Sequence, residues 1–135
     1  IQSWVAALGL ASRGADAAQA RTIEVRSGET AVTYALEDNA AADALLAQLP
    51  LTIEIEDYST NEKIFYPPQA LETAGAPAAS GGAGVLAYYE PWGDVVLFYD
   101  DFSENASLFA LGRAVSGAES IRDLTGTVTV AVAEG

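Results

Sequence analysis

The stretch that decides the fold runs from Tyr88 to Phe102 and reads YYEPWGDVVLFYDDF. It follows on from Val85–Tyr89, which is apolar and rich in strand-forming residues. The segment Glu90–Gly93 predicts a turn, because proline cannot donate a ladder hydrogen bond and glycine tolerates a positive φ. Asp94–Tyr99 then contains a continuous apolar run, which is typical of a strand buried on both faces. We therefore expect a central β-hairpin whose aromatic rings either close the end of the core or line a groove.

Strands are predicted on both sides of this hairpin by the alternation of apolar and polar residues. Two helices are predicted between them. The first follows an N-cap at Asp38 or Asn39 and ends at Pro50, and the second begins near Ser116 and ends at Gly126. The remaining predicted strands are residues 22–26, 30–36, 51–58, 63–66, 108–113 and 127–133. The order β-β-α-β-β-β-β-β-α-β predicts a mainly β fold, a closed barrel of about eight strands with a helix over each open end.

The first twenty residues differ in composition from the rest. Apolar residues at helical spacing predict an N-terminal helix up to about Ala11, so we divide the chain into a helix or tail over 1–21 and a barrel domain over 22–135. Residues 1–12 would then dock on the barrel or on a second copy, giving a homo-oligomer. The alternative is the end of a secretory signal, with Ala18-Gln19-Ala20 as its small-residue site. That alternative implies export, and otherwise we expect a cytoplasmic protein.

Composition excludes several classes of function. The net charge is -13 with six Lys and Arg, too few cations to bind nucleic acid. The sequence has no Cys and no His, which removes disulfides, thiolate metal sites and a Ser-His-Asp triad. It has no apolar run long enough to span a membrane. We expect no cofactor and no metal, because the carboxylates of Asp94, Asp100, Asp101 and Glu104 match no calcium loop and are interpreted as solvated.

Several short motifs carry a resemblance to a known family. They are Leu36–Asn39 (LEDN), Asn61–Lys63 (NEK), Gly75–Pro77 (GAP) and the Pro-Trp-Gly-Asp segment that begins at Pro91. Together, over roughly residues 22–134, they resemble small bacterial cyclophilin-like proteins without assigned function. The segment Leu108–Ile121 also resembles the strand and last helix of cyclophilins. The resemblance implies a cyclophilin-like barrel with two capping helices.

The resemblance does not extend to catalysis. Cyclophilins carry a Phe-His-Arg motif whose arginine acts on the prolyl bond, and the matching stretch here is Glu62–Pro68 (EKIFYPP). It contains no Arg and no His, and a lysine ammonium at Lys63 does not replace a planar guanidinium. We therefore expect a non-catalytic binding module for a peptide or a small ligand. One alternative is a divergent peptidyl-prolyl cis-trans isomerase without the usual arginine, and a further one is an interaction domain that forms oligomers through its N-terminal helix.

A ligand groove is predicted on the barrel face where cyclophilins hold proline. Aromatic rings and one cation are the side chains expected there, since pockets are usually apolar with a few placed polar groups. The alternative is that the rings are core or rim aromatics and that the lysine is a solvated rim charge. The candidate groove residues are Lys63, Phe65, Tyr66, Tyr88, Trp92 and Phe102.

Overall fold

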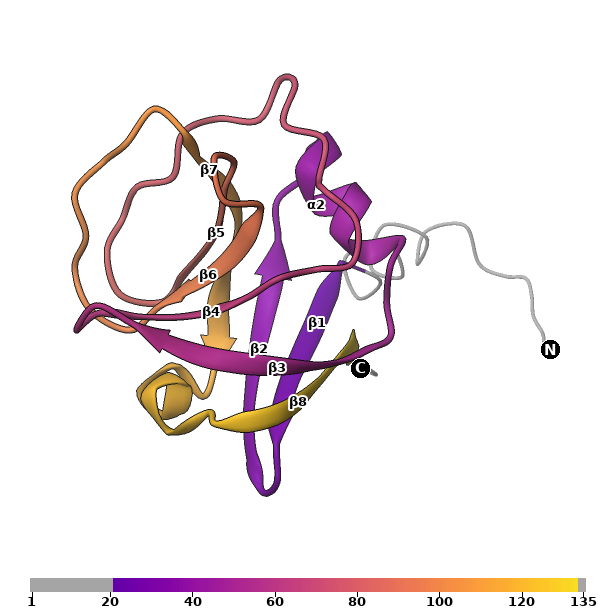
Figure 1. Cartoon of the computed structure of the whole chain (residues 1–135), viewed down its shortest axis with the longest axis vertical. Coiled ribbons are helices and arrows are strands. Elements are labelled where there is room, and N and C mark those ends of the chain that lie inside the picture. The colour runs from indigo at the N-terminus through magenta and orange to yellow at the C-terminus, as the bar shows by residue number, and fades with distance from the viewer. Residues whose placement is uncertain (1–20, 134–135) are drawn as a thin grey trace, which may run out of the picture.

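The computed structural model describes residues 21–133, and they form a closed antiparallel β-barrel (Figure 1). Neighbouring strands follow the order β1-β2-β7-β5-β6-β4-β3-β8 around the barrel. The strands are β1 (Thr22–Ser27), β2 (Thr30–Leu36), β3 (Leu51–Tyr58), β4 (Glu62–Phe65), β5 (Val85–Tyr89), β6 (Asp94–Phe98), β7 (Leu108–Ser116) and β8 (Gly126–Val132). The prediction of a mainly β, eight-stranded closed barrel is confirmed.

The barrel interior holds the larger hydrophobic core, to which every strand contributes alternate side chains. Tyr34, Phe65 and Tyr88 are its largest fully buried rings. At one place two strands approach so closely that a side chain would not fit. A Cβ on Gly112 of β7 would overlap the carbonyl oxygen of Ala35 on β2, so glycine is required at that contact.

Two short helices lie at opposite ends of the barrel (Figure 1). Helix α2 (Ala40–Leu46) begins at Asn39, whose side-chain oxygen accepts a hydrogen bond of 2.8 Å from the Ala42 N–H, as expected of an N-cap. It ends at Leu46 and not at Pro50. The Ala47 N–H still bonds to the carbonyl four residues back, whereas the Gln48 and Leu49 N–H groups bond to carbonyls only three residues back.

The second helix is a 3-10 helix, η2 (Ala118–Asp123), rather than an α-helix. The Ser120 N–H bonds to the Gly117 carbonyl at 2.8 Å and the Leu124 N–H to the Ile121 carbonyl at 3.1 Å, the three-residue spacing of that helix type. The segment still places Ile121 and Leu124 in the barrel core, as the sequence pattern predicts. Two capping helices are thus present, although the second is tighter and shorter than predicted.

A second hydrophobic cluster lies on the outer face of the sheet formed by β4, β6 and β5. Successive residues of β6 point alternately into the barrel and out of it, and all five are buried, which confirms the prediction of a strand covered on both faces. The outer face is covered by loop 99–107 and by the second part of loop 66–84, which contributes Ala79; both are drawn at the left of Figure 1. Loop 66–84 is fixed to β7 by hydrogen bonds from the Ala79 N–H to the Leu108 carbonyl (2.8 Å) and from the Ala110 N–H to the Pro77 carbonyl (2.9 Å).

The predicted N-terminal helix, the signal-like segment and the predicted oligomer contact through residues 1–12 all lie outside the described residues. Within residues 21–133, none of the helices has the length and apolar character needed to cross a membrane.

Candidate functional site

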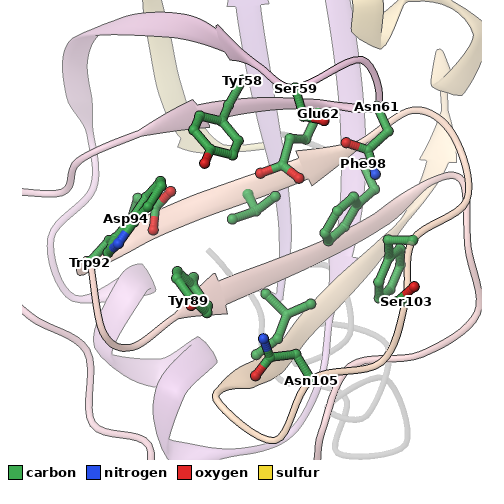
Figure 2. A pocket seen from close by; sticks show the side chains of 13 residues that line it. Tyr58, Ser59, Asn61, Glu62, Tyr89, Trp92, Asp94, Phe98, Ser103 and Asn105 are labelled. Atoms are coloured by element: carbon green, nitrogen blue, oxygen red, sulfur yellow. The ribbon is translucent and has the colours of Figure 1, made fainter.

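A pocket of about 290 Å³ opens on the outer face of the barrel, between the ends of β3, β4, β5 and β6 and loop 99–107 (Figure 2). Its base is the outward face of β6 together with Leu108 of β7, and loop 99–107 forms one wall. Aromatic rings and polar side chains alternate around it. The lining residues are Tyr58, Ser59, Asn61, Glu62, Tyr89, Trp92, Asp94, Val96, Phe98, Phe102, Ser103, Asn105 and Leu108.

Trp92 projects from the turn between β5 and β6. The turn is closed by the Gly93 N–H, which bonds to the Tyr89 carbonyl at 2.9 Å, and Gly93 adopts the positive φ of 72° that the sequence predicts there. The Trp92 ring meets Tyr58 edge-on at 5.0 Å and Tyr89 edge-on at 5.5 Å between ring centroids. Although it is held by two rings, Trp92 is 47% exposed, and Tyr58 is 44% exposed. The rim of the pocket therefore presents aromatic surface to solvent.

The opposite side of the pocket is a stacked pair of rings. Phe98 of β6 and Phe102 of the following loop lie parallel, 3.8 Å apart with an interplanar angle of 13°. The loop is fixed nearby by Asn61, whose side-chain N–H donates to the Asp101 carbonyl at 3.0 Å. Aromatic stacking and this hydrogen bond hold the loop against the sheet.

Two carboxylates lie within this aromatic pocket, Glu62 on β4 and Asp94 on β6. Figure 2 shows both facing the same space, with Tyr58 on one side and Tyr89 on the other. Burial, and secondly the charge of Asp94, raises the pKa of the Glu62 carboxyl from 4.5 to about 7. Burial raises the pKa of the Asp94 carboxyl from 3.8 to about 6, against a backbone hydrogen bond that lowers it. Both groups therefore change charge near neutral pH.

The burial of Asp94 corrects the interpretation of its carboxylate as solvated. Asp94 is 1% exposed, and it begins β6 on the same side as Val96 and Phe98, directly after the turn that carries Trp92. Period-two alternation from Phe98 back to Asp94 was the available signal, and it was missed, as was the outward position of Glu62. In the part of the chain that the structure describes, no three Asp or Glu side chains are grouped so as to hold a metal ion.

The structure brings two of the six candidate groove residues, Trp92 and Phe102, to this pocket. Phe65 and Tyr88 point into the barrel and are each 1% exposed. The Tyr88 hydroxyl accepts a hydrogen bond of 3.2 Å from the Leu71 N–H inside the fold. Tyr66 lies just beyond the end of β4, 45% exposed and outside the pocket lining.

Lys63 lies on the other side of the sheet from the pocket. Adjacent residues of a strand face opposite ways, so Glu62 and Ile64 point outward while Lys63 and Phe65 point inward. Lys63 is 5% exposed, and its ammonium group pairs with the Asp57 carboxylate at 2.7 Å. Lys63 is thus neither a solvated rim charge nor a group that lines the pocket.

Comparison with known proteins agrees with this architecture. The sequence matches the cyclophilin-like family over residues 25–133. The chain belongs to the cyclophilin-like family. No curated protein matches it. Among solved structures, this cyclophilin-like barrel is similar to a hypothetical protein from Archaeoglobus fulgidus whose structure was determined in solution, with a TM-score of 0.67, 19% identity, and coverage of 86% of this chain and 97% of the other.

The pocket of this cyclophilin-like protein is lined by aromatic rings, carboxylates and neutral polar side chains. Rotation about a prolyl bond is accelerated by a placed donor that polarises the amide. Among the described residues, no Lys or Arg lines the pocket, and its ionisable groups are two carboxylates and two tyrosines. The rings can bind apolar groups, the two carboxylates can bind cationic groups, and the neutral polar side chains of the lining supply both donors and acceptors.

Proposed function

We propose that this protein is a non-catalytic binding module that takes a small ligand, or one side chain of a peptide, in the aromatic pocket on the outer face of β4, β6 and β5. The observation that carries the proposal is the exposed aromatic rim. Trp92 and Tyr58 leave nearly half of their surface in solvent while forming the wall of a concave pocket. Pockets that bind small ligands are lined predominantly by hydrophobic and aromatic side chains with a few placed polar groups, as this one is.

The size of the pocket limits the ligand. A cavity of about 290 Å³ is at the small end of the usual range for ligand sites, roughly 300–1,000 Å³. It would accommodate a molecule with one ring, or a single large side chain, rather than an extended segment. Binding in place of isomerisation is favoured because the described pocket residues include no cation to polarise a prolyl amide.

The test is a titration followed by ¹H–¹⁵N NMR, with one-ring compounds and blocked tetrapeptides as probes. We expect shifts at the Trp92 indole N–H and at the side-chain amides of Asn61 and Asn105, which line the pocket. Trp92→Ala should lose the response. Tyr66→Ala is the matched control, because Tyr66 is an aromatic residue of similar exposure outside the pocket. Absence of pocket shifts with every probe would contradict the proposal, as would equal responses of the two variants.

A further inference from the structure

The pocket contains hydrogen-bond acceptors that the protein does not satisfy. Four buried side-chain polar atoms lack a partner among the described residues, and two of them, Asp94 Oδ1 and Asn61 Oδ1, belong to the pocket lining. Burying an acceptor without a donor is unfavourable, and more so when the acceptor is charged. A buried polar group without a partner therefore needs an explanation, and a bound molecule that supplies the missing donor is one.

Asp94 is held in place by the backbone rather than by partners of its own. It follows the Gly93 turn and begins β6, where its pairing with Tyr89 of β5 fixes its direction. Its residue exposure is 1%, and one carboxylate oxygen has no partner. The strand pairing therefore sets the face of the sheet on which the Asp94 carboxylate lies.

Asn61 is similarly fixed. Its side-chain N–H donates to the Asp101 carbonyl, and its backbone carbonyl accepts a hydrogen bond of 2.9 Å from the Tyr99 N–H. The first of these bonds sets the orientation of the amide, so the unpaired atom is the oxygen, an acceptor. Asn61 is adjacent to Glu62, and it adds a neutral acceptor beside that carboxylate.

The protein's own cations within the described residues are engaged elsewhere. Arg21 pairs with Asp43, Arg26 with Glu24 and Lys63 with Asp57. The Arg113 guanidinium donates to the Ser80 carbonyl, and Arg122 lies 5.1 Å from the centre of the Tyr99 ring. None of these five side chains lines the pocket, which leaves Glu62 and Asp94 without a counter-charge.

The aromatic walls suit a cation as well. The faces of Trp and Tyr rings attract positive charge, and more strongly where water is excluded. Trp92 connects Tyr58 and Tyr89 through two edge-on contacts beside the two carboxylates. A pocket with negative charge, unpaired acceptors and π-faces is complementary to a group that carries positive charge, N–H donors and an apolar stem.

We propose that the ligand of this pocket is an organic cation with N–H donors, a primary ammonium or guanidinium group on an apolar stem. The proposal rests on the pocket being a ligand site, as proposed above. In the complex, the cation lies in the space that the Glu62 and Asp94 carboxylates both face, and the stem lies against the rings. The same chemistry is offered by a free amine and by the Lys or Arg side chain of a peptide.

The test is isothermal titration calorimetry of the full chain at about pH 8, where both carboxylates are mostly ionised. Phenethylamine supplies the ammonium, and phenethyl alcohol is its neutral analogue of similar size. Trimethylphenethylammonium keeps the charge but has no N–H donor. A blocked tetrapeptide containing lysine distinguishes a peptide source from a free amine. Ca²⁺ serves as the competing cation for a carboxylate pair.

We expect phenethylamine or the lysine peptide to bind about ten- to a hundredfold more tightly than the alcohol and the trimethyl compound. Asp94→Asn and Glu62→Gln should each weaken that binding at least about tenfold. Glu29→Gln is the control, because Glu29 is an exposed carboxylate in the hairpin between β1 and β2 and its loss changes the net charge equally. Dispersed NMR spectra establish that each variant is folded. If one variant is not folded, the relative affinities of the unaltered protein for the amine, the alcohol and the trimethyl compound test the proposal on their own.

The outcomes separate the two proposals. Binding of phenethyl alcohol as tight as that of the amine, or amine binding that survives both Asp94→Asn and Glu62→Gln, overturns the cation proposal and leaves the ligand pocket standing. Binding of Ca²⁺ without binding of either amine source also overturns it. If no probe binds, both proposals fail.

Discussion

Replacing Asp94 by asparagine should make the unliganded protein more stable at neutral and basic pH. The substitution keeps the shape of the side chain and removes a charge that is buried without a counter-ion, in a residue that is 1% exposed. The pKa of this carboxyl is raised from its ordinary value of 3.8 to about 6 in the folded protein. Since each pH unit corresponds to about 1.4 kcal/mol, the ionised carboxylate lowers the free energy of unfolding by about 3 kcal/mol above pH 6.

The sign of the pH dependence follows from which state loses its proton first. The unfolded chain releases the Asp94 proton near pH 3.8 and the folded protein releases it near pH 6, so the contribution of Asp94 to stability falls as the pH rises between these values. The gain in stability from Asp94→Asn should therefore be small near pH 4 and should reach about 3 kcal/mol by about pH 8. Lowering the pH therefore raises the free energy of unfolding of the unaltered protein through protonation of Asp94. The variant has no titrating group at this position and gains nothing there from the same change.

Urea unfolding of both proteins at several pH values measures this difference directly. The comparison reports Asp94 together with its electrostatic coupling to Glu62, because the Asp94 charge helps to raise the pKa of Glu62 while the rest of the chain is common to both proteins. The groups that line the same pocket and titrate are Glu62, Tyr58 and Tyr89, and Glu62 is the one that changes charge in this range. An Asp94→Asn protein that is less stable than the unaltered protein at about pH 8, or a difference that does not vary with pH, would refute the reasoning.

Three further predictions concern the neighbours of Asp94 and the two sides of β4. The Glu62 pKa of about 7 should fall in Asp94→Asn, because the Asp94 charge contributes to raising it, and an unchanged NMR titration of the Glu62 side-chain carboxyl would contradict this. Trp92→Ala should lower the free energy of unfolding in urea by less than about 1 kcal/mol, since the ring is half exposed, while it abolishes binding in the pocket. A larger loss of stability would show that Trp92 contributes mainly to the hydrophobic core. Lys63→Ala should lower the free energy of unfolding by about 2 kcal/mol, because it removes a buried aliphatic stem and the ion pair with Asp57. Ligand affinity should stay unchanged, because Lys63 faces the barrel interior, and weakened binding in calorimetry would count against that placement.

The secondary structure could be predicted from the sequence because its signals are local. Alternation in Leu51–Tyr58 and the continuous apolar run of Val95–Tyr99 identify strands without knowledge of their partners. The Asn39 cap and the Gly93 turn follow from side-chain and backbone chemistry at single positions. The type of the second helix was not predictable in this way, because a six-residue segment has too few turns for its apolar spacing to separate a 3-10 helix from an α-helix.

The candidate site was only partly predictable, because its residues come from elements that are distant in the chain. Trp92 and Phe102 belong to the aromatic stretch and were found on that basis, whereas Glu62 and Asp94 were not. The sequence predicts Lys63 as a groove residue because it is the cation in the stretch that matches the cyclophilin motif, yet its neighbour Glu62 is the residue that faces the pocket. A one-residue step along a strand reverses the direction of the side chain, so the assignment depends on which face the loops cover.

The sequence by itself determined the order of strands and helices, the turn that presents Trp92 and the scarcity of cations. The tertiary structure decided the rest. Strand β4 pairs with β6 rather than with β5, its successor in the chain, and this places Glu62 and Asp94 on one outer face. Loop 99–107 folds over the Phe98 end of that face, and Asp94 is buried at the other end, next to the Trp92 turn. Strand pairing and loop packing depend on contacts between segments that are distant in the chain. No local sequence pattern can therefore show that the carboxylates of Glu62 and Asp94 share one pocket.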